Sequence, residues 1–207
     1  MIIQQYKIVF AGTMGAGKTE AIRSLSDIPI LLTEALNTDQ ESHSKPQTTV
    51  GIDYGEVTLD DGLIIGLYGT PGQERFDFIW SVICKGAIGA IGAIGAIGAI
   101  GAIGAIGAIG AIGAIGAIIL IDHTLENPIE ELEHYLEVFQ EYTEYIAIGI
   151  THTDGDLNKS TYIYQEWLIK NDLYHPLFMI DARKKDDVKL LLEALITTIE
   201  INYNITA

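Results

Sequence analysis

Hydrophobic positions along the chain follow two patterns that alternate outside one repetitive segment. Short apolar or alternating runs predict β-strands, and apolar residues that recur every three or four positions predict helices. The predicted strands cover residues 6–10, 54–59, 63–67, 118–121, 145–150 and 177–180, and the predicted helices cover 18–26, 128 onward, 160–170 and the region around 188–199. Strands that alternate with helices of this length predict an α/β fold, in which a mostly parallel sheet is covered by helices on both faces.

Local turn and capping signals refine the predicted sheet and one helix. Asp60-Asp61-Gly62 lies between two strand-forming runs, which predicts a hairpin and therefore one antiparallel strand. The sheet is then mixed and six-stranded, with five parallel strands and one antiparallel strand. Asn127-Pro128 followed by Glu130 predicts a helix start with an asparagine side-chain cap and proline at the first helical position.

Residues 86–118 consist of the tripeptide Gly-Ala-Ile repeated eleven times. The charge-free run is long enough to span a bilayer, but glycine at every third position costs a helix in water about 1 kcal/mol each relative to alanine. The fold needs only about two of the units, so we interpret the others as an in-frame expansion within a single domain of residues 1–207. Membrane or partner contact and self-association are the alternatives for this segment.

The charge balance excludes some classes of partner. The formal net charge of −16 argues against binding to nucleic acid or to an anionic membrane, because both need basic surface. Cys84 is the one cysteine, so no disulfide forms within the chain, and we expect a buried thiol. The first residues lack the pattern of a signal peptide, and the expected compartment is the cytoplasm.

A glycine-rich segment between the first predicted strand and helix carries the clearest chemistry. Residues 12–19 read Gly-Thr-Met-Gly-Ala-Gly-Lys-Thr and fit G-x-x-x-x-G-K-[ST] at every specified position. Backbone N–H groups of such a loop, together with the helix N-terminus, favour phosphate. The lysine reaches the β- and γ-phosphates and the threonine hydroxyl ligates Mg²⁺. The expected phosphate and metal contacts are Gly12, Met14, Gly15, Ala16, Gly17, Lys18 and Thr19.

Two further segments follow in a familiar order. Residues 69–76 (Gly-Thr-Pro-Gly-Gln-Glu-Arg-Phe) resemble the switch II segment of Ras-like GTPases, and residues 47–54 (Gln-Thr-Thr-Val-Gly-Ile-Asp-Tyr) resemble the end of switch I. The chain is most similar to bacterial Mgl-type and conservon-type GTPases, which carry Thr-Pro-Gly-Gln. This resemblance implies a three-layer P-loop NTPase fold, GTP and GDP as ligands, Mg²⁺ as cofactor, and a roadblock-fold regulatory partner in signalling, polarity or motility.

The resemblance also implies individual roles. Thr49 binds Mg²⁺, the Gly72 amide contacts the γ-phosphate, and Gln73 orients the attacking water while Lys18 stabilises charge. Gly69 stands where the family has an aspartate that holds a metal-bound water. Metal affinity is therefore expected to depend more on Thr19 and Thr49. Met14 replaces the glycine of many family members, which suggests slow hydrolysis unless a partner corrects the position of Gln73.

The segment expected to recognise the base departs from the family pattern. Asn-Lys-x-Asp appears as Thr151-His152-Thr153-Asp154, in which Asp154 keeps the carboxylate that accepts from guanine N1 and N2. His152 can stack on the base, Thr151 is shorter than asparagine, and the Ala182 amide is expected to face the guanine oxygen. GTP is therefore favoured over ATP, since a wrong base leaves polar groups unpaired. The alternatives are an ATP-dependent P-loop kinase or ATPase, and a non-hydrolysing scaffold or membrane-associated protein.

Overall fold

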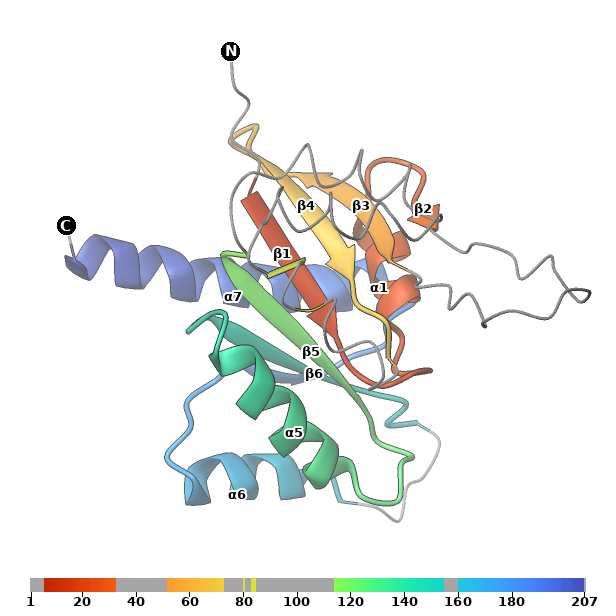
Figure 1. Ribbon diagram of the computed structural model, residues 1–207, viewed down its shortest axis with the longest axis vertical. Coiled ribbons are helices and arrows are strands. Elements are labelled where there is room, and N and C mark those ends of the chain that lie inside the picture. Colours follow the sequence, from red (N-terminus) through yellow and green to blue (C-terminus); the bar gives the residue numbers. More distant parts are fainter. Residues whose placement is uncertain are drawn as a thin grey trace, which may run out of the picture.

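The computed structural model describes residues 6–32, 52–72, 80, 83–84, 114–154 and 160–206 as strands, helices and connections (Figure 1). The strands are β1 (Tyr6–Ala11), β2 (Leu31–Leu32), β3 (Asp53–Thr58), β4 (Ile64–Gly69), β5 (Gly116–Asp122), β6 (Ile146–Thr151) and β7 (Leu177–Met179). The helices in this described part are α1 (Lys18–Leu25), α5 (Pro128–Gln140), α6 (Tyr162–Lys170) and α7 (Lys185–Thr206). The prediction of an α/β chain is confirmed.

The sheet has seven strands in the order β2-β3-β4-β1-β5-β6-β7, so the prediction of six strands is wrong by one. The additional strand, β2, has two residues and pairs with β3 at the edge of the sheet. A two-residue strand is too short to produce an alternating pattern in the sequence. β2 is recognised as a strand only from its pairing with β3. β3 runs antiparallel to both β2 and β4, while the other pairings are parallel. The predicted hairpin and the single reversed strand are therefore confirmed.

Helices pack on both faces of this sheet. In the view of Figure 1, α5 lies beside β5 and β6 with α6 next to it, whereas α7 passes behind the sheet near α1. Alternate residues of the central strands enter the two resulting cores, as Val9 packs in the core with α5 and Ile8 in the core with α1 and α7. Because the central strands are buried on both faces, they read in sequence as continuous apolar runs.

The last two Gly-Ala-Ile units contribute to this architecture. Ala114 and Ile115 lead into β5, whose Ala117 and Ile118 are fully buried. The Ala114 N–H donates to the Cys84 carbonyl over 2.8 Å, so the residues before and after the remaining units meet in space. The prediction that about two units serve the strand agrees with this arrangement. The other units lie outside the described residues.

Residues 83–84 are fixed to the amino end of β1. The buried Lys7 ammonium donates to the Ile83 carbonyl over 3.0 Å and lies 4.9 Å from the centroid of the Tyr68 ring. Cys84 is buried beside it, as predicted, and burial raises the pKa of its thiol to about 12 although Lys7 acts in the opposite direction. These contacts lie at the end of the sheet opposite to the glycine-rich loop.

Two further findings concern the helices. Pro128 begins α5 as predicted, but the Asn127 side chain makes no capping hydrogen bond, so that part of the prediction is wrong. The Asn127 carbonyl instead accepts from the Glu131 N–H at 3.4 Å. Among the described residues, no helix combines the length and the apolar character needed to cross a membrane.

Candidate functional site

The glycine-rich loop, residues 12–19, leads from the central strand β1 into α1 and lies against two other elements. At Gly12 (φ 138°) an added Cβ would stand 2.2 Å from the Leu120 carbonyl oxygen of β5. At Gly17 (φ 94°) it would stand 2.9 Å from the Ala182 Cβ. Glycine alone tolerates both the backbone angle and the close approach at these positions. The loop is thus held against β5 and against the connection between β7 and α7.

Lys18 places its ammonium group inside the curve of this loop. The residue is 8% exposed, and Nζ donates to the carbonyls of Gly12 at 2.7 Å and Thr13 at 2.6 Å. Burial lowers the pKa of Lys18 from 10.5 to about 8, while nearby Asp53 opposes this shift. The site therefore holds a poorly solvated cation, which an anion can stabilise.

Gly72 follows β4 and touches the same part of the loop. A Cβ at this position would stand 2.4 Å from the Met14 backbone nitrogen and 2.9 Å from Lys18 Nζ, so a side chain does not fit. Gly72 and Lys18, which are both expected to contact the γ-phosphate, thus lie side by side. The Met14 side chain is 74% exposed. Gln73 lies outside the described residues, as does Thr49.

Thr19, the residue expected to bind metal, forms a contact that sequence reasoning missed. Its Oγ1 donates to Asp53 Oδ2 over 2.5 Å. Asp53 is the first residue of β3 and pairs with Gly69, the last residue of β4. An acidic residue at the start of a strand-forming run was visible in the sequence, but its relation to Thr19 depends on the register of the β3–β4 pair. Among the described residues, no cluster of three or more His, Cys, Asp or Glu side chains gathers as a metal site.

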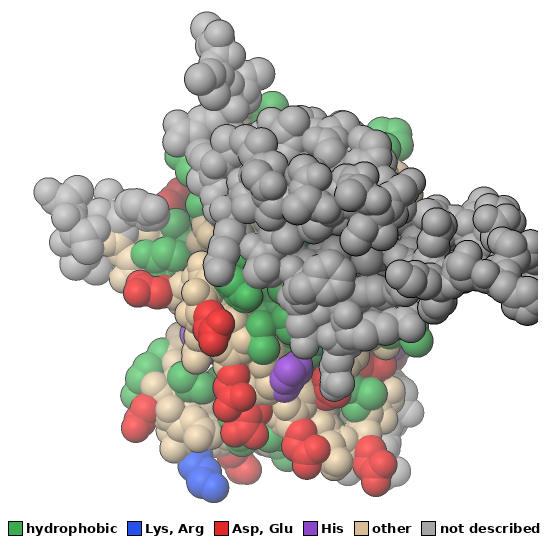
Figure 2. Space-filling model, in the orientation of Figure 1, with side chains coloured by type: hydrophobic (Ala, Val, Ile, Leu, Met, Phe, Trp, Pro, Cys, Tyr) green, Lys and Arg blue, Asp and Glu red, His purple; other side chains and the backbone are tan. Residues whose placement is uncertain are grey.

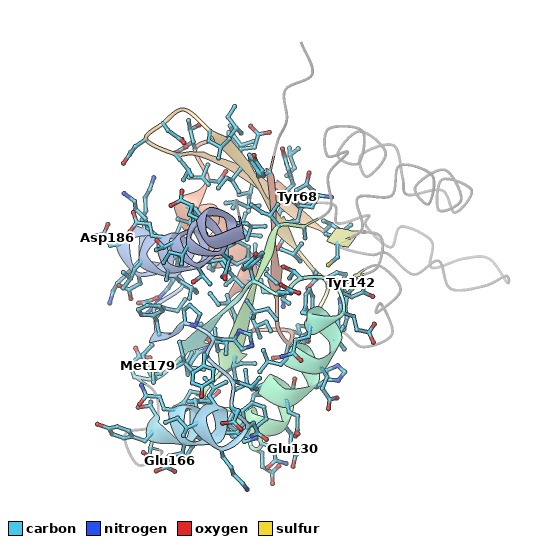
Figure 3. The ribbon with its side chains drawn as sticks, turned by 90° about the vertical axis from the view of Figure 1, so that its left-hand side faces the viewer. Tyr68, Glu130, Tyr142, Glu166, Met179 and Asp186 are labelled. Atoms are coloured by element: carbon cyan, nitrogen blue, oxygen red, sulfur yellow. The ribbon has the colours of Figure 1, made fainter. Side chains whose placement is uncertain are left out.

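A pocket of about 400 Å³ opens beside the loop. Figure 3 labels Met179, which lines the pocket from the end of β7, and Asp186 in the first turn of α7. The predicted site residues that line the pocket are Gly15, Gly17, Thr151, His152, Asp154 and Ala182. The remaining described ones, Gly12, Met14, Ala16, Lys18, Thr19 and Gly72, belong to the loop and its surroundings rather than to the pocket wall. Three segments far apart in sequence, within residues 15–20, 151–154 and 179–187, therefore form one cavity.

Thr151 connects the loop to the strand that carries the pocket. It is buried, and its Oγ1 lies 3.1 Å from the Ala16 carbonyl and 3.3 Å from the Ile121 carbonyl, so the hydroxyl can donate to either. This hydroxyl faces the protein interior, which differs from the base contact considered for it. Its neighbour His152 adopts a left-handed backbone (φ 56°), and its Nδ1 lies 3.3 Å from Asp122 Oδ1.

Hydrogen bonds fix the opposite wall of the pocket. The Asp181 N–H donates to Asp187 Oδ2 at 2.9 Å, which ties the end of β7 to α7. The Arg183 guanidinium donates to both carboxylate oxygens of Asp181, at 2.8 and 2.9 Å, and holds the pKa of that carboxyl well below its usual range. Ala182 lies between these two residues and is buried. Its backbone is thereby held in one position beside the loop.

The chain as a whole is acidic, with a formal net charge of −16. Of the charged side chains that Figure 2 shows over α5 and α6, most are acidic. A polyphosphate can bind such a protein only where local positive charge and backbone N–H groups converge. Lys18 and the glycine-rich loop form such a location.

A comparison of the chain with protein-family models finds none that matches, and a comparison with curated proteins finds no significant relative.

Proposed function

We propose that the protein is a GTP-binding and GTP-hydrolysing molecular switch with a Ras-like P-loop fold. The observation that carries the proposal is the shared pocket: the glycine-rich loop and the segment ending at Asp154 line one cavity of about 400 Å³. They are joined by the contact from Thr151 to Ala16, residues that are 135 positions apart. The segments expected to bind phosphate and to recognise the base thus line one cavity, which supports a single nucleotide site.

The topology supports the same proposal. β1 has β4 on one side and β5 on the other. The chain continues from β1 to the strands on the β4 side and crosses after β4 to the strands on the β5 side, so the strand order reverses at β1. In open α/β sheets, ligands bind outside the carboxyl ends of the strands at such a point. The glycine-rich loop begins there, and Lys18 supplies the cation for the phosphates.

The base preference rests on Asp154 and Ala182. Both line the pocket. The pKa of the Arg183 guanidinium is raised mainly by its hydrogen bonds to Asp181, and the charge of Asp154 adds to this effect. A carboxylate in this position accepts two hydrogen bonds from guanine and none of that kind from adenine. Hydrolysis is assigned to water positioned by Gln73, with Thr19 and Thr49 holding Mg²⁺. A roadblock-fold regulator belongs to the same proposal.

Competition between nucleotides tests the base preference. Fluorescent GTP is displaced from the purified protein by unlabelled GTP or ATP, and GTP is expected to compete better. Asp154→Asn should weaken GTP binding about 5- to 150-fold, since an unmatched buried hydrogen bond costs about 1–3 kcal/mol, with little effect on ATP. Asp60→Asn, in the β3–β4 turn, is the matched control and should change neither affinity. Equal affinity for ATP would favour an ATP-dependent kinase or ATPase.

Hydrolysis requires a separate experiment. Single-turnover GTP cleavage is measured for the wild type and for Gln73→Leu, both loaded fully with nucleotide. The wild type should cleave GTP slowly and the variant should cleave it more slowly still, because phosphoryl transfer depends on positioning of the water. Tight GTP binding without any turnover, even after addition of a roadblock-fold protein, would indicate a non-hydrolysing scaffold.

A further inference from the structure

Asp53 lies beside Thr19, the residue expected to bind Mg²⁺, although its position in the sequence gives no sign of that contact. It is the first residue of β3, and its Oδ2 accepts a hydrogen bond from Thr19 Oγ1 at 2.5 Å. Thr19 is in the first turn of α1, directly after Lys18. The contact therefore brings a carboxylate from the outer part of the sheet to the phosphate end of the site.

The register of β3 and β4 explains why this carboxylate is at position 53. Asp53 pairs directly with Gly69, the residue that departs from the aspartate of the Ras-like pattern. A Cβ at Gly69 would stand 3.0 Å from the Asp53 Cβ and 3.2 Å from its Oδ2. It would also stand 3.0 Å from Ile22 Cδ1. The Asp53 side chain thus fills the space that a side chain at residue 69 would require, and a glycine there is a consequence of this arrangement.

We propose that Asp53 is a positioning residue for the magnesium ion of a bound nucleotide, and that the carboxylate has moved across the β3–β4 pair from residue 69 to residue 53. This inference rests on the proposed nucleotide-binding function. Because the Thr19 hydroxyl donates its hydrogen bond to Asp53, the lone pairs of Thr19 Oγ1 are available to a cation. The carboxylate also adds a negative charge beside the hydroxyl, and Mg²⁺ prefers oxygen ligands of this kind.

The oxygen atoms of these two side chains are suitable ligands for Mg²⁺. Thr19 and Asp53 offer hydroxyl and carboxylate oxygens, and Mg²⁺ usually takes one or two protein oxygens together with phosphates and waters. Outer-shell partners that orient a metal ligand typically change metal affinity 10- to 100-fold when removed. A merely structural role for Asp53, such as tying β3 to α1, would instead alter stability equally with and without the ion.

The experiment measures release of fluorescent GDP from the full-length protein as Mg²⁺ is varied, with excess EDTA as the metal-free limit. In the wild type, Mg²⁺ should slow release. In Asp53→Asn, which keeps the shape and an acceptor for Thr19, the Mg²⁺ concentration that gives half of this effect should rise about 10- to 100-fold. The release rate in EDTA should stay at the wild-type value. Asp60→Asn should leave both quantities unchanged.

A second set of variants moves the carboxylate from residue 53 to residue 69 and gives a more stringent test. Asp53→Gly should lose most of the Mg²⁺ effect, and the double variant Asp53→Gly/Gly69→Asp should regain it, because the aspartate then occupies the vacated space from β4. Gly69→Asp alone should destabilise the protein, since two carboxylates would meet within about 3 Å. Thermal unfolding with and without Mg²⁺ verifies that each variant is folded and gives a second measure of metal binding by its nucleotide complex.

The outcomes separate this inference from the function on which it rests. If Asp53→Asn retains the wild-type Mg²⁺ dependence while nucleotide binding is intact, Asp53 has no part in holding the ion and the inference is overturned. Equal changes in release rate in Mg²⁺ and in EDTA would overturn it as well, in favour of a structural tie. A wild-type protein that binds no nucleotide would refute the proposed function itself.

Discussion

Replacement of Gly12 by alanine should destabilise the fold more than the same change at other glycines with positive φ. At φ 138° the backbone of an alanine is strained by about 1–3 kcal/mol. The added Cβ also stands 2.2 Å from the Leu120 carbonyl oxygen, which is backbone of the central strand β5 and resists displacement. Overpacking of this kind costs about 1–3 kcal/mol. We therefore expect the free energy of unfolding to fall by about 2–6 kcal/mol.

The measurement is equilibrium unfolding of the nucleotide-free protein in urea. The slope m should stay constant, so that the shift of the midpoint reports stability alone. Gly62→Ala and Gly15→Ala are matched controls, because both residues have positive φ (85° and 91°) but nothing lies within 4 Å of an added Cβ. Each should cost only about 1–2 kcal/mol, the penalty of a left-handed backbone. If Gly12→Ala costs no more than these controls, the close approach of the loop to β5 does not exist as described.

Three further predictions concern the site and the repeat. The pKa of Lys18 is about 8, so its ammonium is charged below this pH and neutral above it. Nucleotide affinity should therefore fall as the pH rises from 7 to 9. Lys18→Arg should remove this pH dependence, because arginine stays charged over the whole range. Met14→Gly should speed single-turnover GTP hydrolysis about tenfold, equivalent to about 1.4 kcal/mol of the barrier. An unchanged rate would refute the slow hydrolysis expected from Met14. Deletion of residues 86–112 should leave nucleotide affinity unchanged, because Cys84 and Ala114 already meet, and a large loss would show that the fold depends on the repeat.

Sequence patterns predicted the parts of the fold that have strong local signals. The buried strand ending at Ala11, the Asp-Gly hairpin and Pro128 at the start of α5 each carry their own signature, and the structure agrees with all three. Asn127 shows where such reasoning fails. Its side chain was expected to cap α5 because asparagine commonly does so, but cap geometry depends on backbone angles that the residue type does not determine.

The same distinction applies to the site. Residues 12–19 were selected as the candidate phosphate loop because the motif is one contiguous segment, with its glycines at fixed offsets. Asp53 was missed because its significance arises only when β3 pairs with β4 and brings it beside Thr19. The inward direction of the Thr151 hydroxyl was likewise invisible, since it depends on how closely the loop approaches β6.

The junction between Cys84 and Ala114 has a consequence for how this gene can change. Every Gly-Ala-Ile unit is identical, and β5 uses only the residues that directly precede Ile119. Gain or loss of whole units therefore presents the same residues to the sheet, and the alternation of β5 between its two cores is preserved whatever the copy number. We therefore expect a gain or loss of nine nucleotides to leave both the fold and the proposed nucleotide site, at the other end of the strands, unchanged.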